Sequence, residues 1–206
     1  RPARGVGGDP ATVVSHVNGD ILPELEKATF VTAIYGILDT NSHTFQFVRC
    51  GHTFPAHYKA AAGVVEDVTS EGLVMGSLKG PLFEKKLELK EVTLGPGDSL
   101  TLYTDGIMEA MTEEEEEFGL ERAGETIRRH GPAGSAKAMI EGVIGAVHIF
   151  TRGHPQTDDE TLIVIQRLPE SGSAPIAVLE DVEGAENAGE AAPEAAADAA
   201  DETASE

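Results

Sequence analysis

The most constraining feature of this sequence is a pair of strand-like segments joined by a four-residue turn. Residues 30–39 (FVTAIYGILD) and 44–50 (TFQFVRC) are rich in β-branched and aromatic residues, and TNSH lies between them. Two such runs on either side of a short turn are typical of a β-hairpin, so the sequence predicts antiparallel strands over 30–50. The first run is apolar without interruption, as expected for a strand that is covered on both faces.

The rest of the chain predicts further strands and several helices. The stretch 51–82 is rich in Gly and predicts loops with short strands at most, and GPGD (95–98) is a strong turn signal. The last predicted helix, at 134–151, carries an apolar stripe at helical spacing. Further strands are expected at 84–94, 99–104 and 161–168, and helices at 10–27, 118–130 and 134–151.

The charge of the chain is strongly negative and unevenly distributed. There are 15 Lys+Arg against 36 Asp+Glu, a formal net charge of −21, and residues 170–206 contain 11 of the acids with no Lys or Arg. We therefore divide the chain into one domain at 1–169 and an Ala/Glu-rich tail at 170–206. The tail lacks aromatic residues and is predicted to be disordered, because it cannot bury enough surface to offset its conformational entropy. Neither part has the basic stripe that nucleic-acid binding requires, so no nucleic-acid partner is expected.

Cysteine content and hydropathy limit the disulfides, the metal sites and the cellular location that can be expected for the protein. A single cysteine, Cys50, excludes an internal disulfide framework and a multi-cysteine zinc site. The apolar stretch MIEGVIGAVHIF is too short to span a bilayer and contains Glu141. With no visible signal peptide, the predicted location is cytoplasmic. Because the chain begins with Arg1, we expect it to be a piece of a longer protein.

Two groups of carboxylates stand at predicted strand ends. Asp105 follows the strand 99–104, and TDDE, with Asp158 and Asp159, precedes the strand 161–168. If these strands pair antiparallel, Asp105 and Asp158 meet at one end of the sheet. Facing carboxylates repel each other unless a cation or a proton lies between them, and oxygen ligands favour Mg²⁺ or Mn²⁺ over zinc. The alternative is that each aspartate only caps a turn or a strand entry.

Five motifs stand in order along the chain: FVTAIYGILD (30–39), RCGHTFPAHY (49–58), GLVMG (72–76), LGPGDSLTLYTDGIMEAMTEEEEEFGLER (94–122) and TDDETLIVIQRL (157–168). Over about residues 10–168 they resemble the bacterial SpoIIE-type branch of the metal-dependent PPM (type 2C) serine/threonine phosphatases. Cys50 stands where that family usually has Ala, and Met75 where it usually has Leu.

The resemblance implies a fold, a metal centre and a substrate. It implies an α+β fold of stacked antiparallel β-sheets flanked by helices, with two Mn²⁺ or Mg²⁺ ions whose bridging water attacks phosphoserine or phosphothreonine. By position, the resemblance assigns Asp105 and Asp158 to one metal ion. It implies that Asp159 either contacts these ligands without binding the metal or shares in binding it. The implied partner is a phosphorylated anti-sigma-factor antagonist in bacterial stress or developmental signalling. The resemblance also implies a sensor domain upstream.

The sequence departs from the family pattern at its beginning. The family has an earlier aspartate that bridges both metals and a D.SGHG motif, and neither occurs here. GVGGDP (5–10) matches the earlier GGD motif only superficially, because Asp9 fits better as a helix N-cap before Pro10. We therefore expect a domain that is incomplete at its N-terminus, holds half of the metal site and hydrolyses phosphomonoesters poorly. The rival hypothesis is a degenerate phosphatase-like module that binds a partner without turnover.

The remaining candidate residues favour structural roles. The run Glu113–Glu117 is predicted to be a solvated acidic stretch before a helix. Glu109 is expected to be exposed or to have a structural role. Cys50 and His52 are too close in sequence for a typical nucleophile–base pair, so Cys50 is predicted to be a core residue and His52 a turn residue. His154 is the one histidine close to Asp158, in a Gly/Pro loop.

Overall fold

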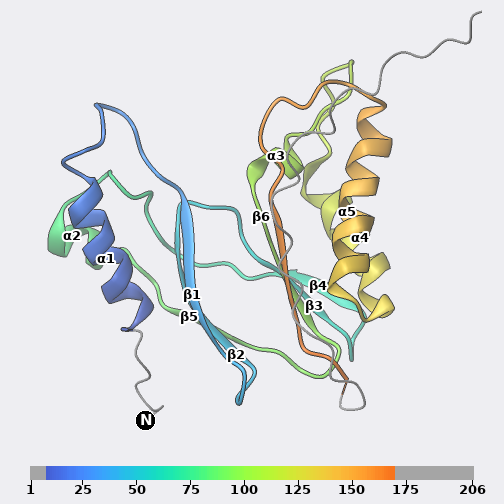
Figure 1. Cartoon of the computed structure of the whole chain (residues 1–206), viewed down its shortest axis with the longest axis horizontal. Coiled ribbons are helices and arrows are strands. Elements are labelled where there is room, and N and C mark those ends of the chain that lie inside the picture. Colours follow the sequence, from blue (N-terminus) through green and yellow to red (C-terminus); the bar gives the residue numbers. More distant parts are fainter. Residues whose placement is uncertain (1–7, 170–206) are drawn as a thin grey trace, which may run out of the picture.

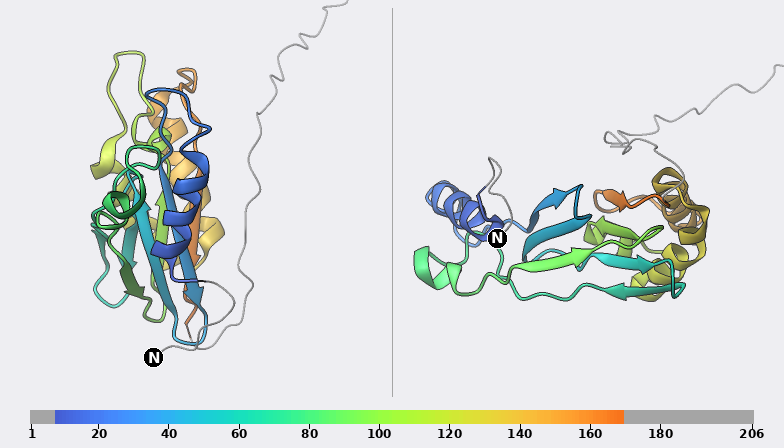
Figure 2. Two further views of the ribbon diagram at one scale, coloured as in Figure 1. Left: turned by 90° about the vertical axis from the view of Figure 1, so that its left-hand side faces the viewer. Right: turned by 90° about the horizontal axis from the view of Figure 1, so that it is seen from below.

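The computed structural model describes residues 8–169 and stacks two β-sheets between two helical layers (Figure 1). Figure 2 shows the same arrangement from the side and from below, with the sheets face to face and helices outside each. The predicted α+β architecture of stacked antiparallel sheets flanked by helices is confirmed. The predicted tail at 170–206 lies outside the described residues.

The first sheet has the order β1-β2-β5 and is built around the predicted hairpin. Its strands are β1 (Ala33–Asp39), β2 (Thr44–Cys50) and β5 (Lys90–Thr93). The hairpin closes where Asp39 faces Thr44, and the Asp39 carboxylate accepts the Asn41 N–H at 2.8 Å. An aspartate that binds the backbone two residues ahead stabilises a tight turn, so the turn chemistry sets the register of this hairpin.

The second sheet has the order β4-β3-β6-β7, and all its neighbours are antiparallel. Its strands are β3 (Ala56–Lys59), β4 (Val64–Asp67), β6 (Ser99–Tyr103) and β7 (Leu162–Gln166). Phe47 and Leu100 are fully buried in the apolar cluster between the two sheets. Tyr103 is opposite Leu162, so the end of β6 lies beside the start of β7.

Helices cover the outer face of each sheet. Helices α1 (Pro10–Ile21) and α2 (Gly80–Glu84) pack on the first sheet around the buried Phe83. Helices α4 (Gly119–His130) and α5 (Ala136–Thr151) pack on the second sheet. The apolar stripe of α5 is buried as predicted, at Met139, Ile140, Val143 and Val147. The short helix α3 (Asp105–Met108) follows β6 and contacts α4, and a 3₁₀ turn, Gly131–Ala133, connects α4 to α5. Asp9 caps α1, because its carboxylate accepts the Thr12 N–H at 3.1 Å.

Two predicted elements are much shorter than expected. The first helix ends at Ile21 rather than at residue 27, because Pro23 cannot donate a helical hydrogen bond. The predicted strand 84–94 is reduced to β5, since a neighbouring loop takes its place beside the end of β2. In that loop the Ser70 carbonyl accepts the Arg49 guanidinium at 2.6 Å, and a Cβ on Gly72 would overlap the Arg49 carbonyl.

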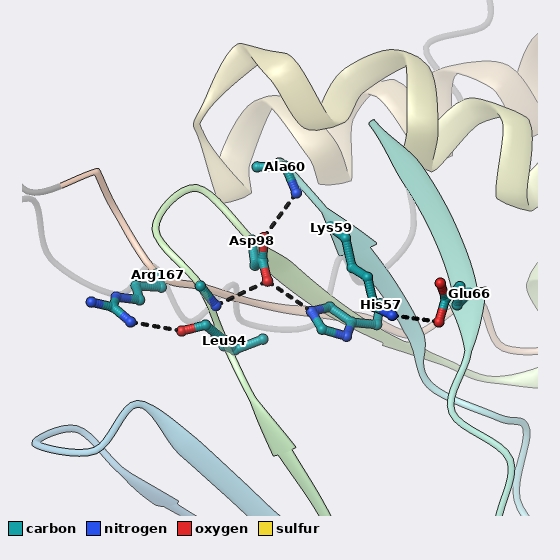
Figure 3. Close-up of polar contacts among 8 residues, drawn as sticks. His57, Lys59, Ala60, Glu66, Leu94, Asp98 and Arg167 are labelled. Carbon is teal, nitrogen blue, oxygen red and sulfur yellow. Dashed lines mark hydrogen bonds and ion pairs between the residues drawn. The ribbon is translucent and has the colours of Figure 1, made fainter. Parts of the chain in front are cut away.

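The start of β6 is closed by a buried carboxylate, as Figure 3 shows. Asp98, in the GPGD turn, accepts the Ala60 N–H at 2.8 Å and the Gly95 N–H at 2.9 Å. His57 Nε2 lies 3.1 Å from the same carboxylate, and both side chains are buried. Arg167 adds a hydrogen bond to the Leu94 carbonyl at 2.9 Å. Three donors therefore satisfy the Asp98 carboxylate, and this end of the sheet is sealed.

Candidate metal centre

The opposite end of β6 carries the candidate metal ligands. Asp105 follows β6 after Thr104, begins α3 and is exposed, and Asp158 and Asp159 lie exposed in the loop before β7. The two backbones pass very close to each other, because a Cβ on Gly106 would stand 2.5 Å from the Asp159 carbonyl oxygen. Glycine is required here for the close approach of the chains. The antiparallel pairing that we predicted thus brings the two carboxylate-bearing segments to one sheet edge.

Thr104 fastens the loop that carries Asp158 and Asp159 to the end of β6. Its hydroxyl donates to the Asp159 carbonyl at 2.8 Å and accepts the Thr161 N–H at 2.9 Å. The Thr104 N–H donates to the Thr161 carbonyl at 3.1 Å, which continues the ladder past the last paired residue. This role of Thr104 was not predicted from the sequence, where the one signal was a hydroxyl residue directly before Asp-Gly at a strand end.

A third segment, the turn after β2, reaches the same edge. The Thr53 hydroxyl donates to the Tyr103 carbonyl, and His52 Nδ1 lies 3.2 Å from the Thr32 hydroxyl. Burial lowers the pKa of His52, the charge of Asp105 acts against this, and Arg49 adds a smaller lowering. His52 has the turn position that we predicted, and it is also close enough to Asp105 to interact with it electrostatically.

The donors at this edge fit a hard cation only in part. Within residues 8–169 no group of three or more His, Cys, Asp or Glu side chains is arranged to hold a metal. Asp158 also accepts the N–H of Asp159 at 2.8 Å, which fixes the direction of its carboxylate. Magnesium is commonly bound by one or two carboxylates, with water and phosphate oxygens completing the shell, so the carboxylates of Asp105 and Asp158 match the number of protein ligands expected for one ion. The ligand roles of Asp105, Asp158 and Asp159 stay predictions.

A pocket of about 150 Å³ opens next to this edge, and its lining includes Gly106, His154 and Asp158. Glu160 also lines it, with only 11% of its side chain exposed, and His148 Nε2 stands 3.8 Å from its carboxylate. Burial raises the pKa of Glu160, and the nearby His148 opposes that shift. His154, which the sequence singled out for its position near Asp158, belongs to this pocket.

The other candidate residues have structural positions. Glu113–Glu117 are all exposed, as predicted, and form a turn closed by a bridge between Met111 and Glu117. Glu109 is exposed at the end of α3. Cys50 is fully buried, and burial raises the pKa of its thiol to about 11, so it is a core residue and a poor nucleophile.

Comparison with known proteins identifies the family. The family described as Stage II sporulation protein E (SpoIIE) matches residues 1–168. The chain belongs to the SpoIIE family. The resemblance inferred from the five motifs is confirmed. Among curated relatives of this SpoIIE-family chain is the phosphoserine phosphatase RsbU of Bacillus subtilis, 26% identical over 166 residues, which cover 78% of this chain and 46% of RsbU. The chain thus spans less than half the length of that relative.

Solved structures of the SpoIIE family and of related phosphatases share the fold. The SiaA-PP2C domain of Pseudomonas aeruginosa has a TM-score of 0.62 at 21% identity, covering 77% of this chain and 61% of that one. The phosphatase domain of SpoIIE from Bacillus subtilis, presoaked with Mn, has a TM-score of 0.53 at 19% identity, covering 84% of this chain and 74% of that one. In the part of the chain that the structure describes, no helix is long and apolar enough to cross a membrane.

Proposed function

We propose that this SpoIIE-family chain takes part in metal-dependent dephosphorylation of phosphoserine or phosphothreonine in a protein. The observation that carries the proposal is the sheet edge where β6 and β7 bring Asp105 beside the loop of Asp158 and Asp159. Exposed carboxylates on adjacent strand ends, with no arginine or lysine in contact among the salt bridges of residues 8–169, provide oxygen donors for Mn²⁺ or Mg²⁺.

The residues of this chain have distinct parts in the proposed reaction. Asp105 and Asp158 hold the cation, and Thr104 keeps the Asp159 carbonyl and the loop in place. A bound Mn²⁺ or Mg²⁺ would neutralise charge on the phosphoryl oxygens and lower the pKa of water for attack on phosphorus. His52, whose pKa burial lowers, adds no full positive charge near neutral pH that would compete with the cation.

The proposed substrate is a phosphorylated regulatory protein, with an anti-sigma-factor antagonist as the specific candidate. Support comes from family membership and from the relative RsbU, whose name is phosphoserine phosphatase. We further propose a cytoplasmic location and control by a sensor domain upstream of this segment.

One observation favours a second function, a phosphatase-like module that binds its partner without turnover. Two carboxylates at the sheet edge and the lack of a third ligating group within residues 8–169 resemble one half of a two-ion centre. A module of this kind would still bind a phosphoprotein, but it would release no phosphate.

Calorimetric titration with Mn²⁺ tests the metal site, and phosphate release separates the two functions. We expect Asp105→Asn to weaken Mn²⁺ binding at least about tenfold, because one charged ligand is lost. Glu113→Gln, which removes an equal charge from the exposed acidic turn, is the matched control. Equal weakening in both variants would refute a specific site. Release of phosphate from a phosphoserine peptide with Mn²⁺, lost in Asp105→Asn, supports the enzyme, and binding of that peptide without release supports the module.

A further inference from the structure

The pocket beside the metal edge, the sheet end formed by Asp105, Gly106, Asp158 and Asp159, contains a mostly buried carboxylate that the proposed reaction does not use. Glu160 lines the pocket together with Asp158 and Gly106, which also belong to the candidate metal edge. The side chain of Glu160 is 11% exposed, whereas that of Glu116, in the acidic turn, is 59% exposed. A carboxylate that is mostly withdrawn from water is more costly to keep ionised than an exposed one unless hydrogen bonds or a cation stabilise it.

The protein supplies Glu160 with little compensation. Between residues 8 and 169 no hydrogen bond reaches its carboxylate, and its one ion-pair partner is His148, at 3.8 Å and 66% exposed. Arg152, the cation of the adjacent loop, does not line the pocket. The pKa of Glu114 is lowered mainly by hydrogen bonds and slightly by Arg152, which places the arginine charge toward the acidic turn.

We propose that this pocket binds an arginine or lysine side chain of the phosphoprotein substrate, close in sequence to the phosphorylated residue. The inference rests on the proposed function and names a feature of its substrate. Ala110 and Met111 give the pocket an apolar wall for the methylene stem of such a side chain, and Glu160 accepts its cationic head.

The position of the pocket fixes the geometry of recognition. Because Asp158 and Gly106 belong both to the pocket and to the metal edge, a phosphate held at the edge lies next to the pocket mouth. An extended peptide advances about 3.3–3.6 Å per residue, so the basic residue belongs within a few positions of the phosphoserine. Specificity then comes from a mostly buried carboxylate that gains a charge-assisted hydrogen bond from a cationic side chain and not from a neutral one.

A set of fluorescent phosphoserine peptides tests this proposal on the full chain in the presence of Mn²⁺. One arginine is moved through each position on either side of the phosphoserine, and glutamine replaces it in the reference peptide. We expect one position to bind about tenfold more tightly than the reference, as a charge-assisted hydrogen bond allows. In Glu160→Gln the ratio of the two affinities should fall below about twofold. In Glu113→Gln, which loses the same charge outside the pocket, the ratio should stay near tenfold.

A second variant acts in the opposite direction and does not depend on the folding of the first. His148→Ala removes the resident partner of Glu160, so the preference for arginine should be kept or increased. Phosphopeptide binding with no arginine preference, or a preference that survives in Glu160→Gln, overturns this inference and leaves the phosphatase proposal standing. Failure to bind any phosphopeptide with Mn²⁺ overturns both. Thermal melting of each variant confirms that it is folded.

Discussion

The two ends of strand β6 carry the same kind of side chain in opposite situations. At the start of the strand, Asp98 is 8% exposed, accepts two backbone N–H groups and pairs with His57. At the other end, Asp105 is exposed and faces a loop that contributes two more aspartates. The first end is sealed, and the second is an open edge with unbalanced negative charge.

The difference shows how the role of an aspartate is decided. A buried carboxylate is tolerated only when its lone pairs are filled, so Asp98 is structural because three donors surround it. Exposed carboxylates that crowd one edge are destabilised mainly by mutual repulsion, and a cation relieves that repulsion. Asp98 therefore contributes to folding, and Asp105 is available for binding.

The largest expected effect is on stability at the sealed end. Asp98→Ala leaves the Ala60 and Gly95 N–H groups and the His57 ring without their acceptor, and should lower the free energy of unfolding by about 3 kcal/mol. Asp105→Ala, at the exposed end, should change it by less than about 0.5 kcal/mol. Urea denaturation with a chelator present measures both, and equal losses would contradict the comparison.

Added Mn²⁺ should stabilise the protein through the open end alone. At a hundred times the dissociation constant, a ligand of the folded state adds about 2.7 kcal/mol. We expect the melting temperature to rise with Mn²⁺ in the wild type and to rise clearly less in Asp158→Asn, which loses one charged ligand. Asp98→Asn should begin at a lower temperature and still rise by a similar amount. A variant at residue 98 that no longer responds to Mn²⁺ would show that the two ends are coupled.

A methyl group at Gly106 should disturb the open edge directly. Gly106→Ala places a Cβ 2.5 Å from the Asp159 carbonyl, and forcing the two chains apart should cost about 1–3 kcal/mol of stability and weaken Mn²⁺ binding. Gly145→Ala, in α5, is the control, because a Cβ there meets no atom within 4 Å and should stabilise the helix by about 0.5–1 kcal/mol. If Gly106→Ala binds Mn²⁺ like the wild type, the close approach of the chains is unimportant for the site.

Much of the fold could be predicted from local sequence signals. The TNSH turn set the β1–β2 hairpin, Asp9 before Pro10 set the start of α1, and the spacing of Met139 and Val143 set the buried face of α5. The extent of β5 could not be predicted, because it depends on the distant contact between Arg49 and Ser70. Such pairings between segments far apart in the sequence leave no periodic signal in either one.

The site was predictable only where strand pairing alone decides it. Asp105 and Asp158 could be placed at one edge because each borders a strand and antiparallel pairing determines which ends meet. Thr104 and Glu160 could not be assigned, since their roles depend on side-chain contacts and burial rather than on position along a strand. Asp98 and Asp105 look alike in sequence, each next to a glycine at an end of the same strand, and only their surroundings distinguish them.

The smallest expected effect is a pH dependence that arises at the open end. Burial raises the pKa of Glu160 above its usual value of 4.5 in the folded protein, so its contribution to stability is full below that value and is lost as the pH rises through the raised pKa. Glu160→Gln removes this contribution, so the variant should gain stability relative to the wild type as the pH rises above about 4.5. Melting temperatures of both proteins across this range, with Glu113→Gln as the control for general charge, measure the difference. A constant difference between wild type and Glu160→Gln would mean that the pKa of Glu160 is the same in the folded and unfolded protein, and the open end would then differ from the sealed end through Asp105 and Asp158 alone.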